Sequence, residues 1–363
     1  MHSLRPLSLR PLSLPRSVAV LAAVAALGLG PALGSFAGGS NERVLRVMSH
    51  DSWALSEELV AQFERDNGVE VEILTSGDAG SAVNTAILAK GNPIADVLYG
   101  IDNTFLSRAL EADIFLPYAP PGLAQVPAEF QLDPQRRVVP IDFGDVCLNY
   151  DIVAMRERGL PPPASLDELV DERYRGLLVV PSPVTSSPGL AFLLATIGHF
   201  GEADFLEFWR RLRANDVLVT GDWESAYFAE FSGASNGSRP LVVSYGSSPP
   251  FEVLFAEQTI TEPSTAAIVA ADTCFRQIEF AGILVGTKNR GLAERWMDFL
   301  LTREVQEDLP LNMFVFPVRS DAELNETFRR FLAVPQQPVQ VDPARIASER
   351  ERWIREWRDV MAR

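Results

Sequence analysis

Cysteine and histidine are scarce in this chain, and their scarcity excludes several kinds of site. Among 363 residues there are two cysteines and three histidines. A metal centre built on these side chains needs several of them close together, and the sequence offers no such cluster. We therefore expect no bound metal and no cofactor. The two cysteines, Cys147 and Cys274, are far apart in sequence, and in an oxidising compartment such a pair is more typical of a disulfide than of a metal site.

Positive charge is also in short supply. The chain carries 32 lysines and arginines against 48 aspartates and glutamates, a formal net charge of −16. Nucleic-acid binding depends on clustered basic side chains that contact phosphates, so a protein this acidic is a poor candidate for it. Acidity favours solubility and, modestly, cationic solutes. We expect a monomer with no nucleic-acid partner.

Long apolar runs are absent after the first 34 residues. Three arginines precede an apolar run over Val18–Leu33, and no acidic residue occurs before Glu42. A charged segment followed by an apolar one is typical of a secretory signal peptide. Residues 1–34 are therefore predicted to direct export to a periplasmic or other extracytoplasmic space, with cleavage near Ser35. An uncleaved N-terminal anchor is the alternative.

After residue 42 the sequence alternates strand-like and helix-like segments. Apolar periodicity predicts strand 44–49, helix 52–65, strand 69–74, helix 79–89 and strand 95–99. This alternation predicts a parallel sheet with helices on both faces, in which ligands bind beyond the carboxyl ends of the strands. The polar residues that follow these strands include His50, Asp51, Asp78 and Asp102. The three aspartates also suit helix capping, which is the alternative interpretation.

Two long strand-like stretches, 138–151 and 272–285, flank a separate α/β region. Within that region we expect strands 177–180, 217–220 and 241–245 and helices 189–200 and 203–213. One region is thus inserted into another, and two chain crossings between lobes form a natural hinge. The predicted class is an α/β fold with two lobes. Lobe 1 comprises residues 43–145 and 275–363, the latter with a C-terminal helical region, and lobe 2 comprises residues 146–274.

Two segments place aromatic rings beside small hydroxyl or backbone donors. Trp223-Glu224-Ser225-Ala226-Tyr227 follows the strand at 217–220, and Tyr245-Gly246-Ser247-Ser248-Pro249 begins at the end of the strand at 241–245. Aromatic faces offer stacking area to a flat organic ring and attract a cation. A third loop, Thr185–Gly189, precedes a predicted helix whose free N–H groups could meet a ligand anion, although its serines also suit capping.

At these residues the chain resembles the thiamine-binding periplasmic proteins, the solute receptors of thiamine ABC importers. The likeness runs from about Val44 to the C-terminus. Its blocks include Ala95-Asp96-Val97-Leu98, Val139-Pro140-Ile141-Asp142-Phe143-Gly144, Thr185-Ser186-Ser187-Pro188-Gly189, Trp223 with Ser225-Ala226-Tyr227, and Ser244-Tyr245 with Ser248-Pro249. The resemblance implies a type II periplasmic binding protein fold and no enzymatic activity. It implies thiamine, thiamine monophosphate or thiamine diphosphate as cargo and a membrane permease as partner.

The resemblance also implies a set of ligand contacts. Carried over residue by residue, they are Asp78, Ala79, Ser186, Ser187, Trp223, Tyr245, Gly246, Ser247 and Ser248. Weaker candidates are His50, Asp51, Asp102, Tyr227 and Phe251. A thiazolium cation suits aromatic faces beside a carboxylate, and phosphate oxygens suit serine hydroxyls. The chain departs from the enterobacterial relative at His50 and Phe251, where that protein has tyrosines, and at Ala79, where it has glycine.

Two other functions are weighed against this one. Thiamine-degrading transferases share the fold and use a cysteine nucleophile, so Cys147 could be a thiol activated by Asp145 or Glu279. Our hypothesis is instead that Cys147 and Cys274 form a disulfide between adjacent hinge strands. A receptor for ferric iron or another small solute is the second alternative. Iron capture typically uses adjacent tyrosines, and the chain has no Tyr-Tyr pair.

Overall fold

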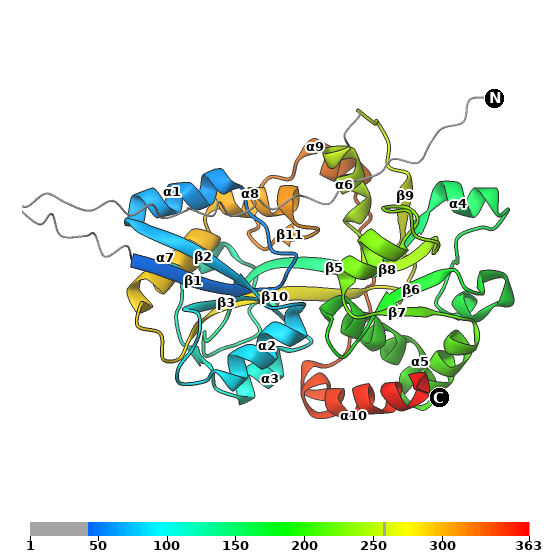
Figure 1. The fold of residues 1–363 in the computed structure, drawn as a ribbon, viewed down its shortest axis with the longest axis horizontal. Helices are drawn as coiled ribbons and strands as arrows, with labels where there is room; N and C mark the ends of the chain where they lie inside the picture. Colours follow the sequence, from blue (N-terminus) through cyan, green and yellow to red (C-terminus); the bar gives the residue numbers. More distant parts are fainter. Residues whose placement is uncertain (1–42, 257–258, 363) are drawn as a thin grey trace, which may run out of the picture.

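A single mixed β-sheet runs through the protein. The computed structural model describes residues 43–256 and 259–362, and the strands lie in the order β2-β1-β3-β10-β5-β8-β6-β7 with helices on both faces (Figure 1). The predicted signal peptide, residues 1–34, lies outside these ranges. Within them no helix combines the length and apolarity needed to cross a membrane.

The first lobe is built on three parallel strands. These are β1 (Arg43–Ser49), β2 (Val69–Thr75) and β3 (Val97–Asp102). All six residues of β3 are buried because this strand lies between two others with helices above and below it. The helices that complete the lobe are α1 (Glu57–Asn67), α2 (Ala79–Leu88), α3 (Leu106–Glu111), α7 (Arg290–Leu300) and α8 (Arg303–Asn312).

The elements predicted for this lobe are confirmed, with shifted ends. The helix expected from Ser52 begins only at Glu57. A turn occupies the interval, in which the Trp53 N–H donates to the His50 carbonyl at 3.2 Å. This turn keeps His50 at the end of β1 instead of drawing it into a helix, and so fixes its place at the edge of the sheet.

Two strands carry the chain between the lobes, as predicted. β5 (Val139–Asp151) and β10 (Phe275–Leu284) pair antiparallel along the middle of the molecule (Figure 1). β10 also pairs with β3 and with the short strand β4 (Phe115–Leu116), while the far end of β5 pairs with β8 and β9. Both crossings therefore lie inside one continuous sheet.

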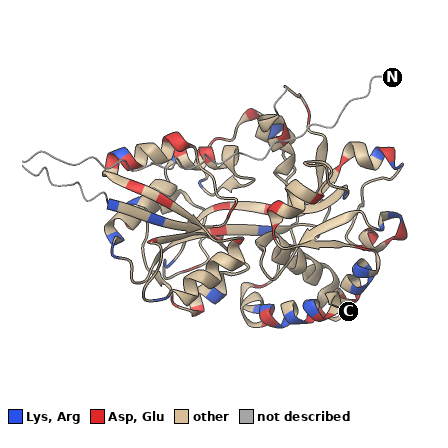
Figure 2. Cartoon of the chain, viewed as in Figure 1, with Lys and Arg blue, Asp and Glu red and all other residues tan. Residues whose placement is uncertain are grey.

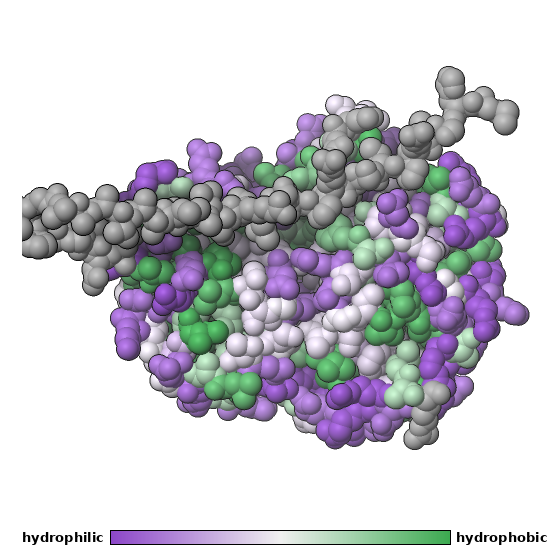
Figure 3. Space-filling view, in the orientation of Figure 1, coloured by the Kyte–Doolittle hydropathy of each residue, from purple (hydrophilic) through white to green (hydrophobic). Residues whose placement is uncertain are grey.

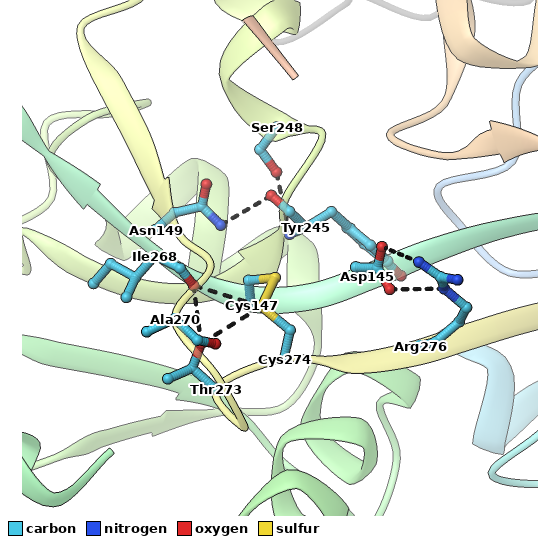
Figure 4. Close-up of a disulfide and its surroundings, with 10 residues drawn as sticks. All are labelled: Asp145, Cys147, Asn149, Tyr245, Ser248, Ile268, Ala270, Thr273, Cys274 and Arg276. Atoms are coloured by element: carbon cyan, nitrogen blue, oxygen red, sulfur yellow. Dashed lines mark hydrogen bonds and ion pairs between the residues drawn. A yellow bond between two sulfur atoms is a disulfide. The ribbon is translucent and has the colours of Figure 1, made fainter. Parts of the chain in front are cut away.

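The predicted disulfide between the crossings is confirmed. Cys147 on β5 and Cys274, the residue before β10, are bonded with S–S 2.15 Å and Cα atoms 4.4 Å apart (Figure 4). Neither cysteine in the described chain is therefore a free thiol.

The second lobe continues the sheet with β8, β6 and β7. The strands of this lobe are β6 (Leu178–Pro181), β7 (Leu218–Thr220), β8 (Leu241–Tyr245) and β9 (Thr265–Ile268). Its helices are α4 (Ile152–Glu157), α5 (Ser187–Ala214), a short π-helix (Ser225–Glu230) and α6 (Ser248–Phe255). The two helices predicted at 189–200 and 203–213 are confirmed: the range of α5 covers both, and the non-helical backbone of Gly201, with φ 75° and ψ 166°, separates them at a kink.

The C-terminal helix lies against both lobes. α10 (Pro343–Met361) begins at Asp342, whose Oδ1 accepts the Ala344 N–H at 2.8 Å. The helix packs on α5 and α3, and its Trp357 ring meets Trp209 of α5 edge-on, with the ring centroids 5.6 Å apart.

The remaining short elements are β11 (Phe316–Pro317), α9 (Glu326–Phe331) and single helical turns at 121–125, 128–130, 167–170 and 172–174.

Charge is distributed unevenly between surface and interior. In Figure 2 charged residues lie on the outer helices and on the strands β1 and β2, and basic and acidic residues follow one another along α10. The face seen in Figure 3 is mainly polar with scattered apolar side chains. The exceptions of interest are acidic residues on the crossing strands β5 and β10, which lie in the middle of the protein (Figure 2).

Candidate functional site

Side chains of the two lobes meet where the strand ends face each other. The Ser187 hydroxyl at the start of α5 donates to the Asp102 carboxylate at the end of β3. Near the protein surface the Ser52 hydroxyl donates to Glu224 Oε1 at 3.0 Å. A Cβ atom on Gly80 would lie 2.9 Å from the Thr185 carbonyl, so α2 packs directly on the loop before α5. The lobes are closed on each other.

Asp78 lies in this contact and has one free oxygen. Its Oδ1 caps α2 by accepting the Ala79 N–H at 2.8 Å, while Oδ2 is buried without a hydrogen-bond partner among the described residues. The Ser186 hydroxyl, from the other lobe, is likewise buried and unpartnered there. Burial raises the pKa of Asp78, and the nearby Ser186 hydroxyl, Ala79 N–H and His50 oppose that rise. A ligand donor between the lobes could satisfy both oxygens.

Trp223 is the centre of an aromatic cluster. Its side chain is 6% exposed, and its ring stacks on Tyr227 with centroids 5.4 Å apart and planes 21° from parallel. The Tyr245 ring lies 6.0 Å away, edge-on. The Trp223 indole N–H donates to Ser244 Oγ at 3.0 Å, which fixes the ring against β8. The two aromatic segments identified from the sequence therefore contribute to one cluster of contacting rings.

The strand β5 makes room for the Tyr245 ring. A Cβ atom at Gly144 would lie 2.7 Å from Tyr245 Cδ1, so only glycine allows this approach. The Tyr245 hydroxyl accepts a hydrogen bond from Gln277 Nε2 at 3.2 Å. Tyr245 thereby joins the aromatic cluster to the polar residues of β10.

Phe314 is a member of the aromatic cluster that the sequence analysis missed. It follows α8, stacks on Phe251 with centroids 3.9 Å apart, and meets Trp223 edge-on at 5.1 Å. Its neighbours in sequence are apolar without a clear period, so no local pattern distinguished it from core residues. Its position depends on how α8 and β11 pack on β5, which only the tertiary structure shows.

The segment Gly246–Ser248 lies under the aromatic cluster with its polar groups engaged. The Gly246 N–H donates to the Asp145 carbonyl at 2.8 Å. The Ser247 hydroxyl donates to the Phe314 carbonyl, and Ser248 Oγ accepts the Tyr245 N–H at 3.2 Å (Figure 4). In the closed protein these groups therefore position the aromatic rings.

Asp51, by contrast, is exposed and accepts the Gly77 N–H at 3.0 Å, apart from the buried residues.

A row of three carboxylates crosses the sheet beside Tyr245. Glu279 on β10 is paired in register with Asp102 on β3 and with Asp142 on β5, so the three side chains lie on one face. All three are buried. Burial raises the pKa of Asp102 to about 7, and the charges of Glu279 and Asp78 add to the rise. Burial and the charge of Glu279 raise the pKa of Asp142 well above its usual range. We call Asp102, Glu279 and Asp142 the acid row.

Neutral donors satisfy part of the acid row. The Tyr99 hydroxyl donates to Asp142, and Gln277 Nε2 donates to Glu279 Oε1 at 3.0 Å. Asp142 Oδ1 and Glu279 Oε2 are buried without hydrogen-bond partners in the described structure. Buried carboxylate oxygens without partners are costly, so the row is suited to a ligand that brings positive charge or donors.

His50 lies against the acid row at the end of β1. Its side chain is buried, and Nε2 lies 3.5 Å from Glu279 Oε2. Gly100, with φ 87°, allows this, since any Cβ there would collide with the imidazole. Burial lowers the pKa of His50, but the charges of Glu279, Asp78 and Asp51 outweigh it, and the pKa is raised overall.

Sequence reasoning missed most of the acid row. From the sequence, Asp142 stands out only within a shared motif and Glu279 only as a possible activator of Cys147, while Tyr99 and Gln277 do not stand out. A usable signal was present: Gln277 and Glu279 are two residues apart on an otherwise largely apolar strand, so they share one face. The spacing within one strand does not show which residues of β3 and β5 lie opposite Glu279.

Known proteins resemble this chain in sequence over most of its length. The family model described as bacterial extracellular solute-binding protein matches residues 92–331. This chain belongs to that family. A relative in the family, the thiamine-binding periplasmic protein of Salmonella typhimurium, is 30% identical over 88% of this chain and 94% of its own.

Solved structures agree with the sequence relatives. A periplasmic thiamin binding protein superposes with TM-score 0.79 and 27% identity, covering 90% of this chain and 98% of its own. Iron-bound HitA from Pseudomonas aeruginosa, with TM-score 0.71 and 20% identity over 88% of this chain and 99% of its own, shows the fold alone. The predicted resemblance and the type II periplasmic binding protein fold are both confirmed.

Proposed function

We propose that this protein captures thiamine outside the cytoplasm and delivers it to the permease of an ABC transporter. One observation carries the proposal: the closed lobes join the rings of Trp223 and Tyr245 to the buried Oδ2 of Asp78 and to the buried carboxyl groups of the acid row. In the part of the chain that the structure describes, no lysine or arginine forms an ion pair with any of these carboxylates. The site therefore combines aromatic area with a row of acidic groups that favours a cationic ligand.

Thiamine matches both properties. Its thiazolium ring is a flat, permanent cation, which an aromatic face and a nearby carboxylate both attract. Its aminopyrimidine ring adds stacking area and N–H donors for buried carboxylate oxygens. The names of the relatives support this choice of ligand over other small solutes.

Thiamine monophosphate and thiamine diphosphate are the related cargo that we propose. The start of α5, with the unpartnered hydroxyl of Ser186, offers donors to a phosphate group. Asp78 and Asp102 lie at the same contact and would repel that phosphate. We therefore propose thiamine as the preferred form and the diphosphate as the weakest of the three.

We propose that binding proceeds by opening and closing of two lobes, residues 43–145 with 275–363 and residues 146–274. Since Trp223, Tyr245 and His50 are all buried in the closed protein, ligand exchange requires the lobes to separate at β5 and β10. The protein is proposed to act as an exported monomer, with residues 1–34 as its signal peptide.

We propose that the protein is not an enzyme. A transferase would need a free cysteine nucleophile, and Cys147 is bonded to Cys274. Ferric iron is less well supported than thiamine, because the described residues include no group of three His, Cys, Asp or Glu side chains that could hold a metal ion.

Calorimetric titration tests the function directly. We expect heat and a single site with thiamine, weaker binding of the mono- and diphosphates, and no binding of thiochrome, a neutral fused-ring oxidation product of thiamine. Absence of binding to thiamine and both phosphates would refute the proposal. Incubation with thiamine and a competing organic base tests the non-enzymatic role, and turnover of thiamine would contradict it.

A further inference from the structure

His50 is a buried histidine to which the binding scheme above gives no task. It is 7% exposed, and its Nε2 lies 3.5 Å from Glu279 Oε2. Neither atom has a hydrogen-bond partner among the described residues. A charged pair at this spacing, without other partners, can be separated by an incoming group more readily than a bonded one.

Acidic side chains from several neighbouring elements surround His50. Glu279 faces it from β10, and Tyr99 faces it from β3 with the two ring centroids 6.2 Å apart. Asp142 on β5 is reached through the Tyr99 hydroxyl, Asp102 through its pairing with Glu279, and Asp51 and Asp78 act from the loops after β1 and β2. These negative charges favour the protonated imidazole more than burial disfavours it, which raises the pKa of His50.

The two nearby arginines, Arg276 and Arg350, form ion pairs with carboxylates outside the acid row. Arg276 on β10 makes a two-point ion pair with Asp145, with both contacts at 2.9 Å. Arg350 on α10 pairs with Glu351 at 2.7 Å, and its guanidinium lies over the Phe105 ring. His50 is consequently the titratable cation closest to the acid row in the described structure.

We propose that His50 is a proton-exchange residue of this site: it balances Glu279 in the ligand-free protein and releases its proton when a cationic ligand binds beside the acid row. The inference rests on the proposed function, because thiamine supplies the cation. The balance is one positive charge for another: the ligand brings its fixed charge, and one proton passes from the imidazole to solvent. The protonated His50 therefore competes with a cationic ligand for the acid row, and this competition weakens as the pH rises.

The sign of the pH effect follows. A bound thiazolium disfavours a second positive charge on the imidazole, so the pKa of His50 is lower in the complex than in the free protein. Between those two pKa values the complex holds fewer protons than its separated components, and affinity therefore rises with pH. One proton released gives about a tenfold gain in affinity per pH unit within that window.

The experiment is titration calorimetry with thiamine from pH 5.5 to 8.5, at each pH in two buffers of different ionisation enthalpy. For the parent protein we expect release of up to about one proton per thiamine bound. His50→Gln keeps a polar side chain of similar length without a titratable group, and it should bind thiamine without proton release and with nearly constant affinity. His199→Gln is the matched control, because His199 pairs with Asp167 at 2.9 Å away from the site, and it should behave as the parent.

Three results would overturn the inference, and they can be told apart. Thiamine binding by the parent without proton release would reject it while leaving the proposed function intact. Unchanged release in His50→Gln would assign the proton to the acid row instead. No binding of thiamine at any pH would reject the function and the inference together. Should His50→Gln fail to fold, NMR titration of the imidazole in the intact protein decides, since a His50 pKa that thiamine does not lower contradicts the inference.

Discussion

Cys147 and Cys274 hold their Cα atoms 4.4 Å apart and so join the two strands on which the chain passes between the lobes. The bond lies directly behind the aromatic cluster: a Cβ atom on Gly246 would contact Cys147 Sγ at 3.5 Å. Two residues along the same strands, Asp145 and Arg276 pair through two contacts of 2.9 Å (Figure 4). A covalent link and an ion pair thus fix the spacing of β5 and β10 beside Tyr245.

The disulfide should stabilise the protein through the long loop it closes. Its cysteines are 127 residues apart, and cross-linking so long a segment restricts the unfolded chain. Replacing both cysteines with alanine is expected to lower the free energy of unfolding by about 2–4 kcal/mol in urea denaturation. A reductant should produce a similar loss in the parent and none in the double variant. Equal stability of the parent and the double variant would show that the bond makes no net contribution.

Trp223 is expected to be the largest single contributor to ligand stacking. Trp223→Ala removes the ring that stacks on Tyr227 and should weaken thiamine binding at least about tenfold, or about 1.4 kcal/mol, in calorimetry. Trp223→Phe is the matched variant, since it keeps a ring while losing the indole bond to Ser244, and it should lose less. Parent-like affinity of the alanine variant would remove Trp223 from the site.

The pH dependence of stability should report on Asp102. Burial raises its pKa from 3.8 to about 7, so between these values the folded protein holds a proton that the unfolded chain has lost. Folding stability attributable to Asp102 is then highest below pH 4 and declines as pH rises to about 7, by up to about 4 kcal/mol. Asp102→Asn should flatten this decline in denaturation measured from pH 4 to pH 8 without ligand. A parallel decline in the parent and the variant would contradict the assignment.

Two hydrogen bonds between the lobes should differ in importance. Ser187→Ala leaves a buried oxygen of Asp102 without that donor and is expected to destabilise the closed form by about 1–3 kcal/mol. Ser52→Ala removes an exposed bond to Glu224 and should cost less than about 0.5 kcal/mol. Stopped-flow tryptophan fluorescence would show faster thiamine release for the first variant only. Equal release rates would mean that the buried bond does not hold the lobes together.

The fold was predictable because its signals are local. The run Leu241–Tyr245 was predicted with the ends that β8 has, since five residues, all but Ser244 apolar or aromatic, are bounded by a proline and a glycine. The helix after β1 was predicted too early because the apolar spacing of Trp53 and Leu55 continues that of the helix, although both residues lie in the turn before it. Apolar spacing alone does not show where a capping turn ends.

The candidate site was predictable only where one segment carries both a suitable side chain and its place at the end of a strand. Asp78 and Trp223 follow strands and were identified in that way. The acid row was missed because it depends on the register of β3, β10 and β5, which are separated by up to 177 residues between Asp102 and Glu279. Ser187 was expected to bind ligand or cap α5, whereas in the closed structure its hydroxyl bonds Asp102 across the lobes.

The C-terminal helix has a consequence for how the chain reaches its native state. α10 follows α5 in the chain by more than a hundred residues, yet it packs on α5, where its Trp357 ring covers Trp209. Until residues 343–361 are available, that surface of α5 is left in contact with water or with chaperones. A chain that stops before residue 343 would therefore expose the apolar surface of α5 that α10 otherwise covers. Quality-control proteases should recognise such a chain by this exposed surface.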